Sequence, residues 1–253
     1  HVGDALRRVP GLALARTSSF GSQQALFLRG GQSNYVRVLV DGVPLNEPGG
    51  VLDLGRITLD DVERIEVVRG PASVLYGSEA VTGVIQIFTR TGDGATRVQS
   101  ELGGGSFGAL RASLGGSGRV LGAQWSLQGD RHASDGVLPY NNAYRNDGIV
   151  GSLRLAPDAR TDVRVMTRYN TSMYEYPTGS AGALEDRNAE RTEHRLVSGV
   201  EVGRRWSSRV ETRAQLTAMD LLPRTNDGSD DAADTLGFYG YYARGTVKRR
   251  SAD

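Results

Sequence analysis

The sequence predicts a small α+β unit followed by long antiparallel strands of a β-barrel. Short mixed segments up to about residue 92 give way to strands in which apolar and polar residues alternate. The joins between those later strands are alternately short and long. Glycine, with 34 of 253 residues, is close to twice its usual frequency of about 7%, so the chain turns often and packs its backbones closely.

The first part contains the expected elements of an α+β unit. Strands are expected over residues 25–28, 35–40, 64–68 and 84–88. Short helical segments are expected over residues 4–9, 60–62 and 72–76. Asp41-Gly42 is a turn signal, from which residues 43–45 can return beside the preceding strand as a hairpin.

From about residue 96 the strands carry charges on one face and apolar residues on the other. Residues 123–128, 162–165 and 209–216 alternate in this way. In a soluble sandwich the charged face would meet water outside, whereas in an outer-membrane barrel it faces a wet lumen and the apolar face meets lipid. Alternation alone does not choose between these architectures.

The lengths of the joins favour the barrel. The joins after the second, fourth and sixth strands are short, near residues 116–118, 156–158 and 206–208. The joins after the third, fifth and seventh strands are long and polar, at about residues 132–143, 175–190 and 222–235. Only the join after the first strand, near residue 105, is short where a long one is expected. Short turns at one end and long loops at the other are typical of outer-membrane barrels.

The composition excludes several kinds of site. Lys+Arg of 30 against Asp+Glu of 29 leaves no block of one sign to attract a nucleic acid. The chain has no cysteine, and its three histidines include no pair with ligand spacing. Residues 227–231 are acidic but lack the full spacing of a calcium loop. No catalytic constellation is present, so neither an enzyme, a cofactor nor a metal site is predicted.

Short motifs occur in order along the first ninety residues. They cover residues 4–11, 27–31, 38–45, 62–71, 75–77 and 83–87. In this order and spacing they resemble the plug domain of TonB-dependent outer-membrane receptors. The resemblance implies an N-terminally truncated plug over residues 1–92 and the start of the receptor β-barrel over residues 93–253. It also implies a location in the outer membrane.

The family architecture is a barrel of 22 transmembrane strands with a plugged lumen. At roughly 20 residues per strand and connection, residues 93–253 supply about eight strands. The energy-coupling box that pairs with TonB is expected to lie outside this sequence. We therefore expect the chain to be a fragment of a longer protein.

The resemblance implies a receptor that takes up a scarce ligand with energy from TonB. The run from Asn34 to Asn46 and the sequence after Gly77 are most similar to cobalamin receptors and their siderophore-receptor relatives. Two alternatives stay open. One is a soluble β-rich binding module, and the other is a small outer-membrane barrel that closes by itself, although its own side chains would fill the interior.

The resemblance assigns two roles to plug residues. Arg29 and Arg69 are expected to pair with carboxylates on the inner barrel wall, because a guanidinium in a low-dielectric lumen needs a carboxylate to offset lost hydration. The alternative is that each is a surface cation beside a turn. The expected ligand-facing plug apices are Gln32, Ser33, Asn34, Tyr35, Asn46 and Glu47. For these, ordinary polar turn chemistry is the alternative.

Overall fold

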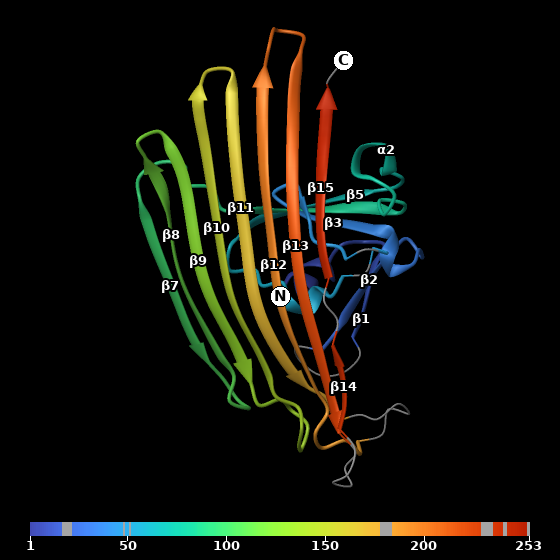
Figure 1. Cartoon of the computed structure of the whole chain (residues 1–253). Helices are drawn as coiled ribbons and strands as arrows, with labels where there is room; N and C mark the ends of the chain where they lie inside the picture. The colour runs from blue at the N-terminus through green and yellow to red at the C-terminus, as the bar shows by residue number, and fades with distance from the viewer. Residues whose placement is uncertain are drawn as a thin grey trace.

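The computed structural model places a small N-terminal unit against one face of a large antiparallel sheet (Figure 1). It describes residues 1–16, 22–47, 49–50, 52–177, 184–228, 235–239 and 242–251. Side chains are described up to residue 227 of these ranges.

The N-terminal unit is built from two small sheets. Its elements are α1 (Val2–Leu6), β1 (Leu12–Arg16), β2 (Gln24–Leu28), η1 (Ser33–Tyr35), β3 (Val36–Val40), β4 (Val43–Pro44), η2 (Leu54–Arg56), β5 (Val62–Arg69), α2 (Ser73–Tyr76) and β6 (Gly83–Thr89). Strands β1 and β2 pair antiparallel, and the second sheet has the order β4-β3-β6-β5 with β3 and β6 parallel. Leu28, Val38, Leu54 and Ile85 lie in its hydrophobic core.

The expected strands of this unit are present, but some local details differ. A single hydrogen-bonded turn is present at residues 60–62, where Val62 N donates to the Leu59 carbonyl at 3.0 Å, and it leads directly into β5. A 3-10 helix that was not predicted lies earlier, at η2, where the Asp53 carboxylate accepts a hydrogen bond from the Gly55 amide at 2.9 Å and caps it. The first helix ends at Leu6, before the expected residue 9, and strand β1 was not predicted.

The large sheet consists of long strands joined mostly as neighbouring hairpins. Its strands are β7 (Arg97–Gly104), β8 (Leu110–Val120), β9 (Ala123–Ser134), β10 (Tyr144–Asp158), β11 (Thr161–Glu175), β12 (Glu190–Arg205), β13 (Glu211–Gly228), β14 (Thr235–Tyr239) and β15 (Tyr242–Ser251). Strands β7 to β13 follow chain order across the sheet. Strands β14 and β15 pair with successive parts of the same edge of β13.

The short turns gather at one end of the sheet and the long joins at the other (Figure 1). One predicted turn is misplaced, because residues 116–118 lie inside β8, where Ser117 pairs with both Arg97 and Ser126. The turn is at Leu121-Gly122, whose φ values of 49° and 83° suit a two-residue hairpin. Strand β13 also continues to Gly228, through residues expected in a loop.

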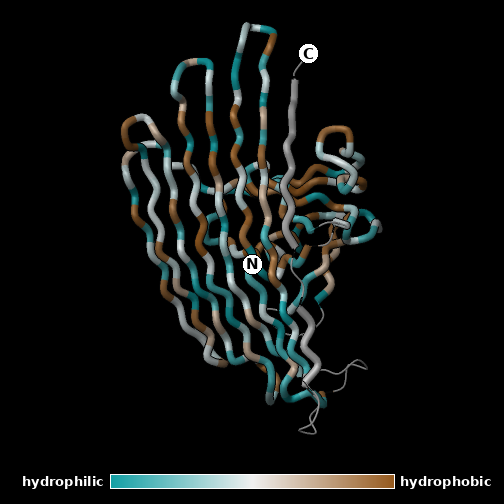
Figure 2. Tube along the Cα trace, in the orientation of Figure 1, coloured by the Kyte–Doolittle hydropathy of each residue, from teal (hydrophilic) through white to brown (hydrophobic). Residues whose placement is uncertain are grey.

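The two faces of the large sheet have opposite polarity. Apolar and polar segments alternate along its strands in Figure 2. Cross-strand pairing aligns five apolar residues into one row: Trp125, Leu153, Val165, Val200 and Leu216. Leu153, Val200 and Leu216 are exposed, whereas polar residues on the opposite face are buried against the N-terminal unit. This is the reverse of a soluble sandwich, which buries its apolar face.

No helix in the described part of the chain is both long and apolar enough to span a membrane.

Candidate functional site: the interface between plug and wall

The N-terminal unit, residues 1–92, is called the plug below, and the sheet β7–β15 is called the wall. The strongest contacts between them are ionic. The plug residues that make them belong to two segments, one containing η2 and the approach to β5 and the other following β4. The wall contributes residues on the polar faces of β8, β9, β11 and β12.

Arg56 anchors the first segment. Its Nε lies 2.8 Å from Asp53 Oδ2 within the plug, and its Nη1 lies 3.0 Å from Glu193 Oε2 on β12. Nη1 also donates to Ser172 Oγ on β11 at 2.8 Å. Burial acts to lower the pKa of Arg56, but the carboxylates of Glu193 and Asp53 outweigh burial and raise it. The guanidinium therefore stays charged inside the interface.

Glu193 joins this anchor to a second one. Arg195 Nε lies 3.1 Å from Glu193 Oε1 on the same face of β12. Arg195 Nη2 reaches Glu47 Oε1 of the plug at 2.8 Å, and Nη1 donates to the Leu45 carbonyl at 3.2 Å. A continuous chain of charges therefore runs from the plug through the wall and back to the plug.

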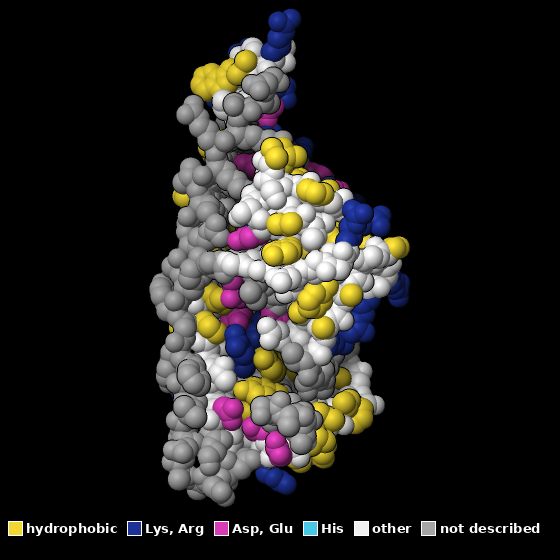
Figure 3. Space-filling view, turned by 90° about the vertical axis from the view of Figure 1, so that its right-hand side faces the viewer, with side chains coloured by type: hydrophobic (Ala, Val, Ile, Leu, Met, Phe, Trp, Pro, Cys, Tyr) yellow, Lys and Arg dark blue, Asp and Glu magenta, His cyan; other side chains and the backbone are white. Residues whose placement is uncertain are grey.

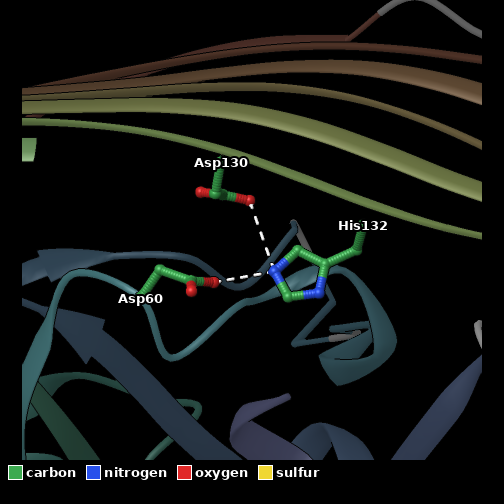
Figure 4. A group of neighbouring side chains, drawn as sticks. All are labelled: Asp60, Asp130 and His132. Atoms are coloured by element: carbon green, nitrogen blue, oxygen red, sulfur yellow. Dashed lines mark hydrogen bonds and ion pairs between the residues drawn. The ribbon is translucent and has the colours of Figure 1, made fainter. Parts of the chain in front are cut away.

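A separate group of contacts surrounds the residues before β5. Asp61 Oδ2 lies 2.6 Å from Arg168 Nη2 on β11, and both side chains are 5% exposed. Arg111 Nη2 of β8 lies 2.9 Å from Asp60 Oδ1. His132 Nε2 of β9 lies 2.8 Å from the other oxygen, Asp60 Oδ2 (Figure 4). Burial acts to raise the pKa of Asp60, but the hydrogen bonds to His132 and Arg111 lower it to about 2.

Farther toward the short turns, a cleft of about 630 Å³ separates plug and wall. Its lining includes Asp41 and Arg64 from the plug and Glu201 and Arg213 from the wall. Burial raises the pKa of Asp41, although hydrogen bonds from the Thr89 hydroxyl and amide partly counter it. The interface thus combines charged anchors with an open polar cleft.

The structure brings Arg29 and Arg69 into one region of the plug. Arg29 has a φ of 54°, and its Nη1 lies 3.9 Å from the Cβ position of Gly70. Arg69 Nη1 donates to the Pro10 carbonyl at 3.3 Å. Among the residues that the structure describes, neither arginine has an ion pair with a carboxylate. Their pairing with the barrel wall stays a prediction.

The six residues expected at the plug apices lie in two adjoining loops. Ser33–Tyr35 forms η1, and Gly50 lies so close to the Asn34 carbonyl that a Cβ at this position would collide with it. Asn46 is only 2% exposed, and its amide bonds the backbone at Val38 N, Val36 O and Gly50 O. For Asn46 the structure thus favours the turn alternative, and Glu47 is held by Arg195.

The anchors were not predicted from the sequence. They are Asp53, Arg56, Asp60 and Asp61 on the plug and Arg111, His132, Arg168, Glu193 and Arg195 on the wall. One signal was available for the wall: Glu193 and Arg195 are two positions apart in an alternating strand and so share its polar face. No comparable pattern marks the plug residues.

The plug also exposes hydrophobic side chains away from the anchors. Several appear among charged residues in the face shown in Figure 3. Val68, Val74, Leu75 and Val81 are 43%, 99%, 58% and 42% exposed. These side chains belong to β5, α2 and the segment before β6.

Comparisons with known proteins agree with this architecture. Residues 1–84 match the TonB-dependent Receptor Plug Domain family. Over 240 residues, covering 92% of this chain, the sequence is 29% identical to the vitamin B12 transporter BtuB of Vibrio vulnificus (strain CMCP6). The chain spans 39% of the length of that transporter.

Solved structures show the same fold. The ferric citrate transporter FecA matches 98% of this chain with a TM-score of 0.77 and 18% identity, and the match covers 41% of FecA. The copper transporter OprC also matches 98% with a TM-score of 0.76 and 18% identity, covering 40% of OprC. Residues 1–84 thus match the plug domain of TonB-dependent receptors, and plug and wall together share the fold of these solved transporters.

Proposed function

We propose that this chain is part of an outer-membrane transporter that takes up a scarce ligand with energy supplied through TonB. The polarity of the wall carries the proposal. Its outer face presents an apolar row suited to lipid, and its inner face holds a plug through buried ion pairs. A soluble binding module would be expected to reverse these faces.

Cobalamin is the first candidate ligand, because the similarity to a vitamin B12 transporter extends over 92% of the chain. Ferric siderophores are the second. Structures that share the fold include a siderophore receptor, PiuA from Acinetobacter baumannii, with a TM-score of 0.71. Its 17% identity supports the fold alone, so the ligand has to be tested directly.

The ligand would contact the plug at Gln32, Ser33, Asn34 and Tyr35. Glu47, in the adjoining loop, is bound to Arg195, only five positions from Glu190, where β12 begins after a long join. This contact supports a position of the two plug loops toward the long-loop end of the wall. In this proposal Asn46 and Glu47 fix the loops, while the other four residues meet the ligand.

Arg29 and Arg69 would pair with carboxylates on barrel strands beyond those of this chain. Arg29 lies in a turn and Arg69 ends β5, and neither has a carboxylate partner in the described range. The exposed apolar residues of β5 and α2 point to the same arrangement, since further strands would cover them. The relatives are transporters and receptors, which supports a role without catalysis.

Uptake by the protein from its complete reading frame tests the proposal. It would be expressed in a Gram-negative strain that lacks its own cobalamin receptor, and labelled cyanocobalamin accumulation would be measured with and without TonB. We expect TonB-dependent accumulation. A parallel assay with ferric siderophores in a strain lacking their receptors tests the second ligand class.

A matched pair of variants locates the ligand surface. Asn34→Ala combined with Gln32→Ala should weaken ligand binding, whereas Val98→Ala on the outer face should leave it unchanged. Normal outer-membrane insertion without TonB-dependent uptake of either ligand class would overturn these ligand assignments. Recovery of a folded protein in the soluble fraction without detergent would overturn the proposal that the chain is part of an outer-membrane transporter.

A further inference from the structure

Three ligand-type side chains meet between the plug and the wall (Figure 4). Asp60 comes from the plug, and Asp130 and His132 come from the inner face of β9. His132 Nε2 lies 2.8 Å from Asp60 Oδ2 and 3.9 Å from Asp130 Oδ2, and the three ligand atoms all lie within 4.8 Å of one another. Tetrahedral ligands at about 2.0–2.2 Å from a metal ion stand roughly 3.3–3.6 Å apart, so shifts below about 1 Å would suffice.

The burial of the Asp130 carboxylate is a second observation that points to a bound ion. Its side chain is only 2% exposed, and its Oδ2 has no hydrogen-bond donor among the residues that the structure describes. Its other oxygen accepts from Thr58 Oγ1 at 3.3 Å. A buried carboxylate oxygen without a donor is costly, and in Figure 4 this oxygen points toward the imidazole.

The surrounding charges leave room for a cation. Asp60, Asp61 and Asp130 carry three negative charges, while Arg111 and Arg168 supply two positive ones. Arg111 binds Asp60 through Oδ1, which leaves Oδ2 free to face the imidazole. These carboxylates and guanidinium groups together leave one negative charge unbalanced, and Asp130 has no arginine within ion-pair distance in the described structure.

The backbone also makes space for Asp130. Gly148 lies opposite Asp130 on β10, and a Cβ at that position would lie 2.8 Å from Asp130 Oδ1. A cavity of about 390 Å³ reaches His132 and Asp60 from the side of β7 and β8. A small hydrated ion therefore has both a coordination position and an entry path.

We propose that Asp60, Asp130 and His132 form a divalent transition-metal site that links the plug to the wall. One imidazole and two carboxylates suit zinc, cobalt or nickel, whereas calcium and magnesium prefer oxygen ligands alone. The fourth position would hold water from the adjoining cavity. The site does not depend on which ligand the receptor transports. The bound ion would bridge one plug segment and one wall strand at a single point.

Metal titration of the complete receptor, purified in detergent and stripped with a chelator, tests the site. Cobalt(II) chloride would be added without cobalamin, and visible absorption would report low-symmetry coordination. We expect one equivalent to bind, and zinc to displace it. His132→Gln and Asp130→Asn should each weaken binding by about tenfold or more, as the loss of a ligand should cost at least as much as the loss of a supporting group.

His194→Gln is the matched control, because His194 lies on the opposite face of β12 and contacts Tyr169. It should bind cobalt like the parent protein. Resistance of the barrel to unfolding in detergent would show that each variant is folded. Equal binding by the parent and His132→Gln would overturn the proposal, and so would an absence of binding in the parent.

Discussion

At the scale of single residues, Glu193 is the wall carboxylate on which the plug depends most. It is 2% exposed and contacts both Arg56 and Arg195. Removing one member of a buried ion pair leaves the remaining charges uncompensated and typically costs about 3–5 kcal/mol. We expect Glu193→Gln to lower the free energy of unfolding by about 3–5 kcal/mol. Denaturant unfolding of the protein in detergent measures this change.

Asp147→Asn provides the comparison for that prediction. Asp147 contacts Arg145 on the exposed face of β10, where an ion pair is worth about 0–1 kcal/mol. In the double variant Glu193→Gln with Arg56→Gln, part of the loss should be recovered, because the guanidinium that Glu193 neutralises is also removed. Equal, small losses for Asp147→Asn and Glu193→Gln would contradict a role for Glu193 in holding the plug.

Asp41 gives a prediction for pH at the same scale. Burial raises its pKa in the folded plug. A raised carboxyl pKa favours folding below the unfolded pKa of about 3.9, and this contribution is lost as pH rises through the folded pKa. We expect Asp41→Asn to be more stable than the parent at neutral pH, with the gap narrowing toward about pH 4. Melting temperatures across this range measure it, and a gap that does not change with pH would contradict it.

At the scale of elements, local patterns predicted the strands but not their partners. Alternation located β9, β11 and β13 because it depends only on neighbouring residues. The anchors join residues far apart in sequence: Arg195 and Glu47 are 148 positions apart, and Arg168 and Asp61 are 107. Pattern along one strand identifies a polar face, but it carries no information about which plug carboxylate will dock there.

The β8–β9 turn shows why glycine misled the prediction. Residues 115–118 include three glycines, yet they remain paired within β8. Leu121 instead adopts a φ of 49° at the turn, a conformation that costs a residue with a Cβ about 1–2 kcal/mol and that asparagine tolerates. We expect Leu121→Asn to stabilise the wall by about 1 kcal/mol. Unfolding in denaturant measures this change in stability, and Val120→Thr at the neighbouring exposed position is the control. A loss of stability in Leu121→Asn would contradict the assignment of the turn to this position.

At the scale of the whole molecule, the two faces of the wall meet different surroundings. The outer face presents the apolar row, while the inner face holds the plug through ion pairs, hydrogen bonds and an apolar contact in which Met166, Val197 and Met219 pack with the plug core. The polar contacts can be exchanged for contacts with water, whereas an entirely apolar interface would resist separation. Such polar contacts suit the proposed transporter, if its plug moves relative to a barrel that stays in the membrane.

The apolar row provides the test at this scale. Val200 lies within it, paired with Val165 and Leu216 on the neighbouring strands. A charge facing the middle of a bilayer costs about 2–4 kcal/mol, but only about 0–1 near the interface. We therefore expect Val200→Arg to impair folding of the complete receptor into lipid vesicles far more than Leu222→Arg, which lies nearer the long-loop end of β13. Equal effects of the two substitutions would mean that this face of the wall does not meet lipid, because water would solvate both arginines alike.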